Sequence, residues 1–117
     1  MRIIQAVAAL ALSACAGTPP ILSNRMNDAD QERLRGAHWY AFNGTLAQQS
    51  VWSNVGTGLG GTVRALEEYR DPGTGQQCRK VVEDTRSTAG ERDIRIGTAC
   101  RQTDGDLVVV YSGRVEE

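Results

Sequence analysis

The stretch from Gly75 to Tyr111 constrains the fold most, because it combines strand patterns with a strong turn signal. Alternate residues from Ile94 to Cys100 are apolar or β-branched, and this period of two is typical of a half-buried strand. Asp104-Gly105 then separates this run from a second one. Asp-Gly at such a position predicts a hairpin, since a type I′ turn needs positive φ at both central residues. The stretch therefore predicts an antiparallel β-meander.

Length and charge exclude several classes of protein. The chain has 117 residues, which leaves room for one domain. Its 13 basic and 14 acidic residues give a net charge of −1, so no basic field would attract nucleic acid. Only 5% of the residues are aromatic and 13 are glycine, so we expect a modest core that a covalent cross-link would stabilise.

The N-terminus has the features of an export signal. Met1-Arg2 supplies a short positive region, and Ile3 to Leu12 is an apolar run interrupted by Gln5. This run is too short to span a bilayer, which needs about 20 apolar residues. A signal peptide is therefore predicted over residues 1–14.

The end of this run, Leu12-Ser13-Ala14-Cys15, resembles the lipobox of bacterial lipoproteins. The resemblance implies cleavage before Cys15 and its acylation with fatty acids such as palmitate. The alternative is an ordinary signal peptide followed by a chance cysteine. Several acyl chains would hold the protein firmly on a membrane, and Ala16 in place of an aspartate favours the outer membrane. Residues 15–27, with two adjacent prolines and few charges, are predicted as the lipidated cysteine and a flexible tether.

The domain is predicted over residues 28–117, with a helix at about 28–43 and strands within about 50–112. Asp28 and Gln31 have capping-box spacing, and Asn43-Gly44 is a plausible end. An apolar stripe at helical spacing consists of Leu34, Ala37, His38 and Ala41. His38 is the one histidine of the chain, and packing is favoured over a role as a ligand or base.

Two later segments each allow a second interpretation. Gly56 to Gly61 matches the dinucleotide fingerprint G-x-G-x-x-G, but no second βαβ unit follows, so we interpret it as a turn between strands. Residues 62–70 have good helix propensity but also alternate as a strand does, with Glu67 breaking the alternation. Periodicity leaves strand and helix open there.

A resemblance to a known family is carried by Trp52-Ser-Asn, Gly61-Thr-Val, Tyr69-Arg70, Gly75-Gln-Gln-Cys78-Arg79 and, most specifically, Gly97-Thr-Ala-Cys100-Arg101-Gln102-x-Asp104-Gly105. Through these segments, roughly residues 50–111 resemble the C-terminal domain of the 17 kDa surface antigen lipoproteins of Gram-negative bacteria. The resemblance implies a strand at 62–70. This chain departs from the family at Asp106-Leu107, where an aromatic residue is usual, and lacks the glycine zipper of longer members. The family is known for its location and has no established catalytic residues.

Cys78 and Cys100 remain as an even pair once Cys15 is assigned to the lipid. In an exported protein this predicts a disulfide, which in the chain-entropy model adds about 3 kcal/mol of stability. Free thiols or redox chemistry are the alternatives. A metal site is disfavoured, because zinc wants four ligands and the chain has one histidine and no Cys-x-x-Cys.

We identify no catalytic residues and predict no cofactor, no small-molecule substrate and no nucleic-acid partner. Cys78 and Cys100 bracket a candidate hairpin whose charges alternate in sign, singly or in pairs. We interpret these charges as a solvated face, or alternatively as a recognition edge. They are Arg79, Lys80, Glu83, Asp84, Arg86, Glu91, Arg92, Asp93 and Arg95.

The sequence thus predicts a mainly β (α+β) fold, a small antiparallel meander of four to five strands with one N-terminal helix. We expect a non-catalytic outer-membrane lipoprotein or surface antigen, held to the membrane by Cys15, on its periplasmic face or at the cell surface. Its partner would be another envelope protein. The alternative is a periplasmic binding or inhibitor module that engages such a protein by strand addition at a sheet edge.

Overall fold

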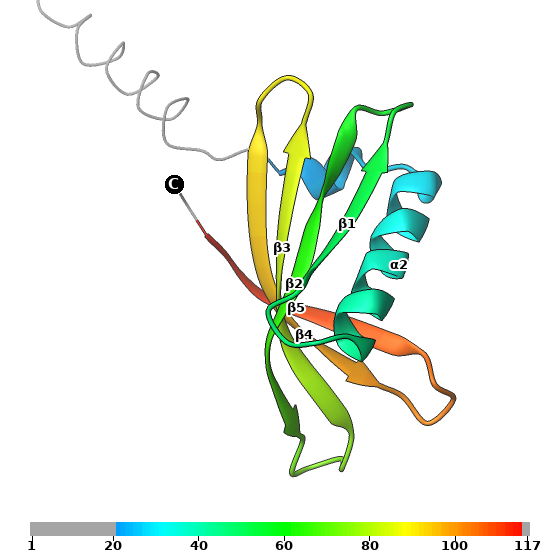
Figure 1. Cartoon of the computed structure of the whole chain (residues 1–117), viewed down its shortest axis with the longest axis vertical. Coiled ribbons are helices and arrows are strands. Elements are labelled where there is room, and N and C mark those ends of the chain that lie inside the picture. The colour runs from blue at the N-terminus through cyan, green and yellow to red at the C-terminus, as the bar shows by residue number, and fades with distance from the viewer. Residues whose placement is uncertain (1–20, 116–117) are drawn as a thin grey trace, which may run out of the picture.

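The computed structural model describes residues 21–115, so the predictions for residues 1–14 and for Cys15 lie outside the described residues. Five strands form one antiparallel sheet in chain order, and a helix packs on one of its faces (Figure 1). The elements are the 3₁₀ helix η1 (Leu22–Arg25), α2 (Asp28–Asn43), β1 (Gln49–Asn54), β2 (Leu59–Arg70), β3 (Gln77–Ser87), β4 (Arg92–Arg101) and β5 (Leu107–Val115). The predicted fold class is confirmed.

Helix α2 has the predicted bounds but a different cap. Asn27 is the N-cap: its side chain accepts from the backbone N–H of Asp30 at 2.9 Å, and the Asp30 carboxylate accepts from the Asn27 N–H at 3.0 Å. This capping box satisfies two N–H groups that the first turn leaves unpaired. At the other end, the guanidinium of Arg79 from β3 donates to the carbonyls of Ala41 and Gly44 at 2.9 and 2.7 Å. The predicted stripe, including His38, is buried.

The structure differs from the predicted tether over residues 21–27, because the fold begins before residue 28; the rest of the predicted tether lies outside the described residues. Leu22 is fully buried in η1, and its backbone N–H donates to Asp93 Oδ2 at 3.0 Å. Arg25 pairs with Glu91 at 2.6 Å. An apolar residue and a cation thus hold the entering chain against the sheet.

The ambiguous segment 62–70 lies in β2 and is a strand. Its register with β3 shifts between Ala65 and Glu67, so Leu66 forms a β-bulge. A bulge adds one residue to one strand and reverses the side-chain alternation beyond it. This explains why Glu67 breaks the pattern and why Glu68, on the helix side, reaches Arg79 at 2.7 Å.

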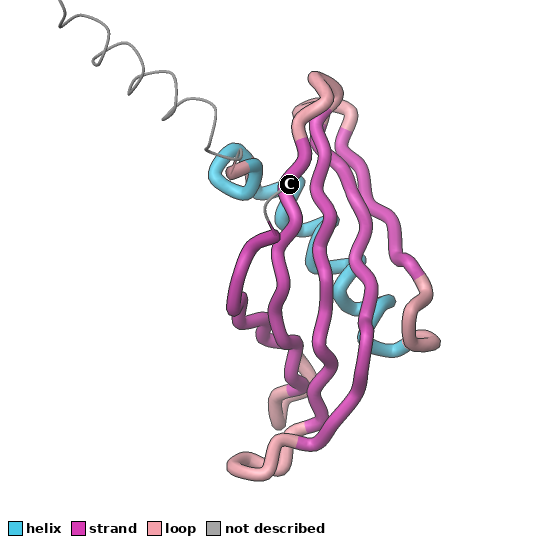
Figure 2. Tube along the Cα trace, turned by 90° about the vertical axis from the view of Figure 1, so that its left-hand side faces the viewer, coloured by secondary structure: helices cyan, strands magenta, loops and turns pink. Residues whose placement is uncertain are grey.

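The sheet has a helix face, packed against η1 and α2, and an open face on the other side (Figure 2). On β4, the residues on the helix face are more polar than those on the open face. They include Asp93 and Ala99, which are buried. Ile94 and Ile96 lie on the open face and are half-buried. The apolar core contains Leu22, Leu34, Phe42, Trp52, Val63 and Val81.

Each of the four hairpin turns contains a glycine with positive φ: Gly58, Gly75, Gly90 and Gly105. The predicted Asp104-Gly105 hairpin is confirmed, but its turn is not of type I′. Gln102 N–H donates to Asp106 O at 2.7 Å, and only Gly105 of the loop has positive φ. This is the three-residue loop in which glycine takes the left-handed position.

The meander places the turns in pairs at opposite ends of the sheet (Figures 1 and 2). Turns 55–58 and 88–91 lie with η1 at what we call the η1 end, where Thr88 N–H donates to Gly58 O at 2.9 Å. Turns 71–76 and 102–106 lie at the far end. Within residues 21–115, no helix is both long and apolar enough to cross a membrane.

Candidate functional site

A buried carboxylate joins three elements between the helix and the sheet. Glu83, on the helix face of β3, is 1% exposed. One of its oxygens accepts from His38 Nε2 of α2 and from the Tyr111 hydroxyl of β5. The other accepts from Arg95 of β4, with Nε at 3.1 Å and Nη2 at 2.6 Å. We call these four residues the Glu83 cluster.

The electrostatics of the cluster favour an ionised Glu83. Burial by itself disfavours a charged carboxylate, but the hydrogen bonds from His38 and Tyr111 and the charge of Arg95 outweigh it. They hold the pKa of Glu83 below its ordinary value. Burial and then the Glu83 charge raise the pKa of the Tyr111 phenol, so this hydroxyl stays a donor. The Arg95 guanidinium also lies 3.8 Å from the centroid of the Tyr111 ring.

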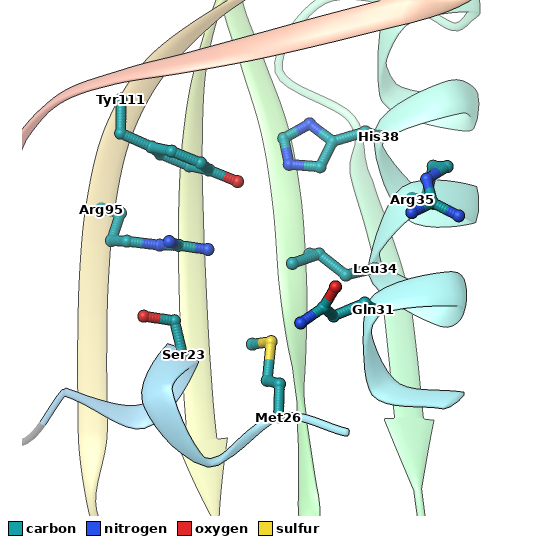
Figure 3. A pocket seen from close by; sticks show the side chains of 8 residues that line it. All are labelled: Ser23, Met26, Gln31, Leu34, Arg35, His38, Arg95 and Tyr111. Atoms are coloured by element: carbon teal, nitrogen blue, oxygen red, sulfur yellow. The ribbon is translucent and has the colours of Figure 1, made fainter. Parts of the chain in front are cut away.

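A pocket of about 330 Å³ opens beside the cluster (Figure 3). Tyr111 and Arg95 reach it from the sheet, and His38 and Leu34 from the helix. Figure 3 also shows Ser23 on η1, across the pocket from His38.

The arrangement positions the helix and offers little for chemistry. The charge of Arg95 is already balanced by Glu83, and the Tyr111 proton is directed at the same carboxylate. His38 Nδ1 is buried without a partner, and the described residues contain no hydrogen bond between His38 and Ser23. In residues 21–115, no group of three or more His, Cys, Asp or Glu side chains could hold a metal ion. We interpret the cluster as a buried polar contact that fixes the position of α2 relative to β3, β4 and β5.

The interpretation of the hairpin charges as one solvated face is wrong for about half of them. Glu83 and Asp93 are buried, and Arg79 and Arg95 lie on the helix face with largely covered side chains. A period of two sends alternate charges to opposite faces, so a run of charges along a strand cannot all be solvated when one face is covered. Sequence reasoning missed the cluster, although Glu83 stands in phase with buried Val81, which was the available signal.

The predicted packing of His38 is confirmed, and the structure adds its contact with Glu83. Cys78 and Cys100 are joined in a disulfide between directly opposed positions of β3 and β4. It lies on the open face, away from the Glu83 cluster. Glu67 and Glu68 point to opposite faces, as expected for adjacent strand residues.

Two curated proteins are similar to this chain, and both carry the name of the family that the sequence resembles. The chain is 34% identical over 86 residues to the "17 kDa surface antigen" of Rickettsia bellii (strain RML369-C), and a second Rickettsia bellii protein of that name gives the same values. The match covers 73% of this chain and 53% of each relative. The chain therefore spans about half the length of the curated relatives it matches. No protein-family model matches the chain, and no solved structure matches it significantly.

The name of these relatives describes a surface protein and no enzymatic activity. Their identity to this chain confirms the family predicted from the segments around Cys78 and Cys100. Over the aligned residues, the chain belongs to the 17 kDa surface antigen family.

Proposed function

We propose that the protein is a non-catalytic lipoprotein of the bacterial outer membrane, anchored through Cys15, with an interaction role in the envelope. The surface name of the relatives and the lipobox-like Leu12 to Cys15 support the location. The observation that carries the interaction role is the open face of the sheet, on which neither α2 nor η1 packs and where Val108 and Val110 are exposed.

The open face has the composition of a contact surface. Val82 pairs with Ile96 across β3 and β4, and β5 adds further valines of which Val110 is 65% exposed. Charged side chains surround these apolar ones: Arg64, Glu67, Lys80, Asp84, Arg86 and Arg92. Contiguous apolar surface with a polar rim is typical of protein interaction sites.

Fatty-acid labelling tests the anchor. Cells expressing the wild type or Cys15→Ala would be grown with a radioactive fatty acid, and their envelopes fractionated. We expect label on the wild type alone, in the outer-membrane fraction. Unlabelled wild type recovered in the cytoplasm would contradict the anchor and the location together.

Capture from envelope extracts tests the open face. A soluble Cys15→Ser form would be cross-linked to solubilised envelope proteins and compared with the same form carrying Val110→Asp. The matched control is Thr103→Asp, an exposed position in the far-end loop. We expect a defined partner that Val110→Asp loses and Thr103→Asp retains. Recovery of the protein alone, with an envelope defect on deletion, would favour a structural role.

An edge-binding module is the second candidate, because β5 is an edge strand of nine residues. An unpaired edge can accept a strand from a partner. Hydrogen exchange on the captured complex separates the two modes. Strand addition would slow the β5 amides that do not pair with β4, whereas contact through the open face would leave their exchange rates unchanged.

A further inference from the structure

The point where the chain enters the fold is fixed at one end of the sheet. Leu22 is buried and bonded to Asp93, and Arg25 is paired with Glu91 beside turn 88–91. A small pocket of about 180 Å³ is shared by η1 and both turns of the η1 end. The N-terminus of α2 is held there too, because Asp30 accepts from Thr57 Oγ1 at 2.7 Å.

The proposed anchor lies very close to this entry point. Ile21 is the sixth residue after Cys15. A fully extended chain covers at most about 3.5 Å per residue, so the acylated cysteine lies within roughly 20 Å of Ile21. Strand β2 alone has 12 residues, which at a rise of about 3.3 Å spans roughly 35–40 Å. The tether is therefore shorter than the sheet, and the η1 end is the end held near the membrane.

The two ends of the sheet differ in the character of their turns. At the η1 end, turns 55–58 and 88–91 carry one charged side chain, Glu91, whose charge is balanced by Arg25 at 2.6 Å, and Val55 is 97% exposed. At the far end, turns 71–76 and 102–106 carry Asp71, Asp104 and Asp106 and no basic residue. An anionic membrane surface repels the acidic end and does not repel the end whose turn charge is balanced.

We propose that the η1 end is a membrane-facing surface, on which Val55 contacts the interfacial region of a phospholipid bilayer. A single exposed valine is common on protein surfaces, and the assignment depends on its position at the end to which the anchor leads. The inference rests on the proposed acylation of Cys15. The acidic turns then point away from the bilayer. The open face is roughly perpendicular to the membrane surface, where a neighbouring envelope protein can reach it.

The test uses the full acylated protein in vesicles of phosphatidylcholine and phosphatidylglycerol. A fluorophore is attached to a cysteine introduced as Val55→Cys or, at the far end, Thr103→Cys. Both positions are exposed, and the native thiols are occupied by lipid and by the disulfide. Nitroxide-labelled lipids report contact by quenching, and near-UV circular dichroism checks the fold of each variant. We expect quenching at position 55 to exceed that at position 103 several-fold.

Flotation of the vesicles separates the two ways in which the proposal can fail. Protein that floats with the vesicles but is quenched equally at both positions, or more at position 103, would overturn the orientation and leave the anchor standing. Protein that carries no acyl chain by mass spectrometry and does not float would overturn the anchor and the orientation with it.

A charge substitution tests the contribution of Val55 itself. With the fluorophore on Ala89→Cys, in the neighbouring turn, Val55→Asp should reduce the quenching at least twofold. Val110→Asp, on the open face, is the matched control and should leave it unchanged. Equal quenching in both variants would show that Val55 makes no membrane contact.

Discussion

At the residue scale, Glu83 connects the helix to the sheet through one buried carboxylate. His38, Tyr111 and Arg95 donate to it from three different elements. A buried charge is costly unless it is paired and hydrogen-bonded, and here each oxygen is engaged. The cluster therefore specifies how α2 sits on the sheet, where small apolar residues such as Ala65 and Ala99 supply little contact area.

Glu83→Gln should destabilise the protein by about 3–5 kcal/mol, because it leaves the largely covered Arg95 charge without its counter-charge. Equilibrium unfolding in urea measures the change. Glu67→Gln is the matched control: this side chain is 61% exposed and lies 3.6 Å from Lys80. Its loss should stay within about 0.5 kcal/mol. Similar losses of unfolding free energy in both variants would contradict a stabilising role for the Glu83 cluster.

The stability of the protein should fall on acidification. The pKa of Glu83 in the folded state is held below its ordinary value of 4.5. The unfolded chain therefore binds protons first as the pH drops below about 4.5. The stabilisation by Glu83 is present above that pH and is lost as the pH falls through the folded-state pKa. Asp84 contributes in the same direction: burial opposes its charge, but Arg92 and Arg86 outweigh it and lower its pKa.

Unfolding free energies measured between pH 3 and pH 7 check this linkage. We expect a decline below about pH 4.5 in the wild type and a shallower one in Glu83→Gln. An identical pH dependence in the two proteins would show that Glu83 titrates alike in the folded and unfolded states.

At the element scale, β2 determines how closely the strands approach. It pairs with both β1 and β3, and Gly61 lies between Trp52 of β1 and Thr85 of β3. A Cβ at Gly61 would meet the Asp84 carbonyl oxygen at 2.1 Å, which no side chain tolerates without movement of the backbone. The glycine is there for close packing, since its φ is not in the left-handed region.

Gly61→Ala should cost about 1–3 kcal/mol or more, the usual result of overpacking. Thermal unfolding followed by circular dichroism measures it, with a loss of roughly 4–8 °C per kcal/mol for a domain of this size. Gly113→Ala in β5 is the control, because a Cβ there meets nothing within 4 Å. An unchanged melting temperature for Gly61→Ala would mean that the strands can separate without cost.

At the scale of the whole molecule, five strands are covered by one helix and a short 3₁₀ turn on a single face (Figure 1). Such a domain buries a limited share of its surface. The disulfide links the central strands β3 and β4 at the positions of Cys78 and Cys100, 22 residues apart in sequence. It closes a loop in the unfolded chain and so lowers the conformational entropy of that chain.

Cys78→Ser with Cys100→Ser should lower the free energy of unfolding by about 3 kcal/mol in the chain-entropy model. Denaturant unfolding of the soluble Cys15→Ser form, with and without this pair of substitutions, measures the difference. Thiol titration provides the control. The denatured Cys15→Ser form should show no thiol before reduction and two after it, and two thiols without reductant would contradict the disulfide.

Local sequence was sufficient for the helix and the meander, because both depend on neighbours in the chain. The cysteine pair followed from the number of cysteines and the predicted export. The stripe from Leu34 to Ala41 repeats with the period of a helix, and glycines such as Gly105 occupy turn positions that other residues avoid. The sequence also indicated the family through the segments around Cys78 and Cys100. Residues 62–70 could be assigned as a strand only through that resemblance, because a bulge at Leu66 interrupts the period of two that would have identified the strand.

Only the tertiary structure decided which face of the sheet is covered and which charges are buried. A period of two divides a strand into two faces but does not say which of them receives the helix. On β4 the helix took the face with Asp93 and Arg95 and left Ile94 and Ile96 open. Burial of Glu83 is possible because partners from three other elements converge on it, and such convergence depends on the pairing of strands and the docking of α2.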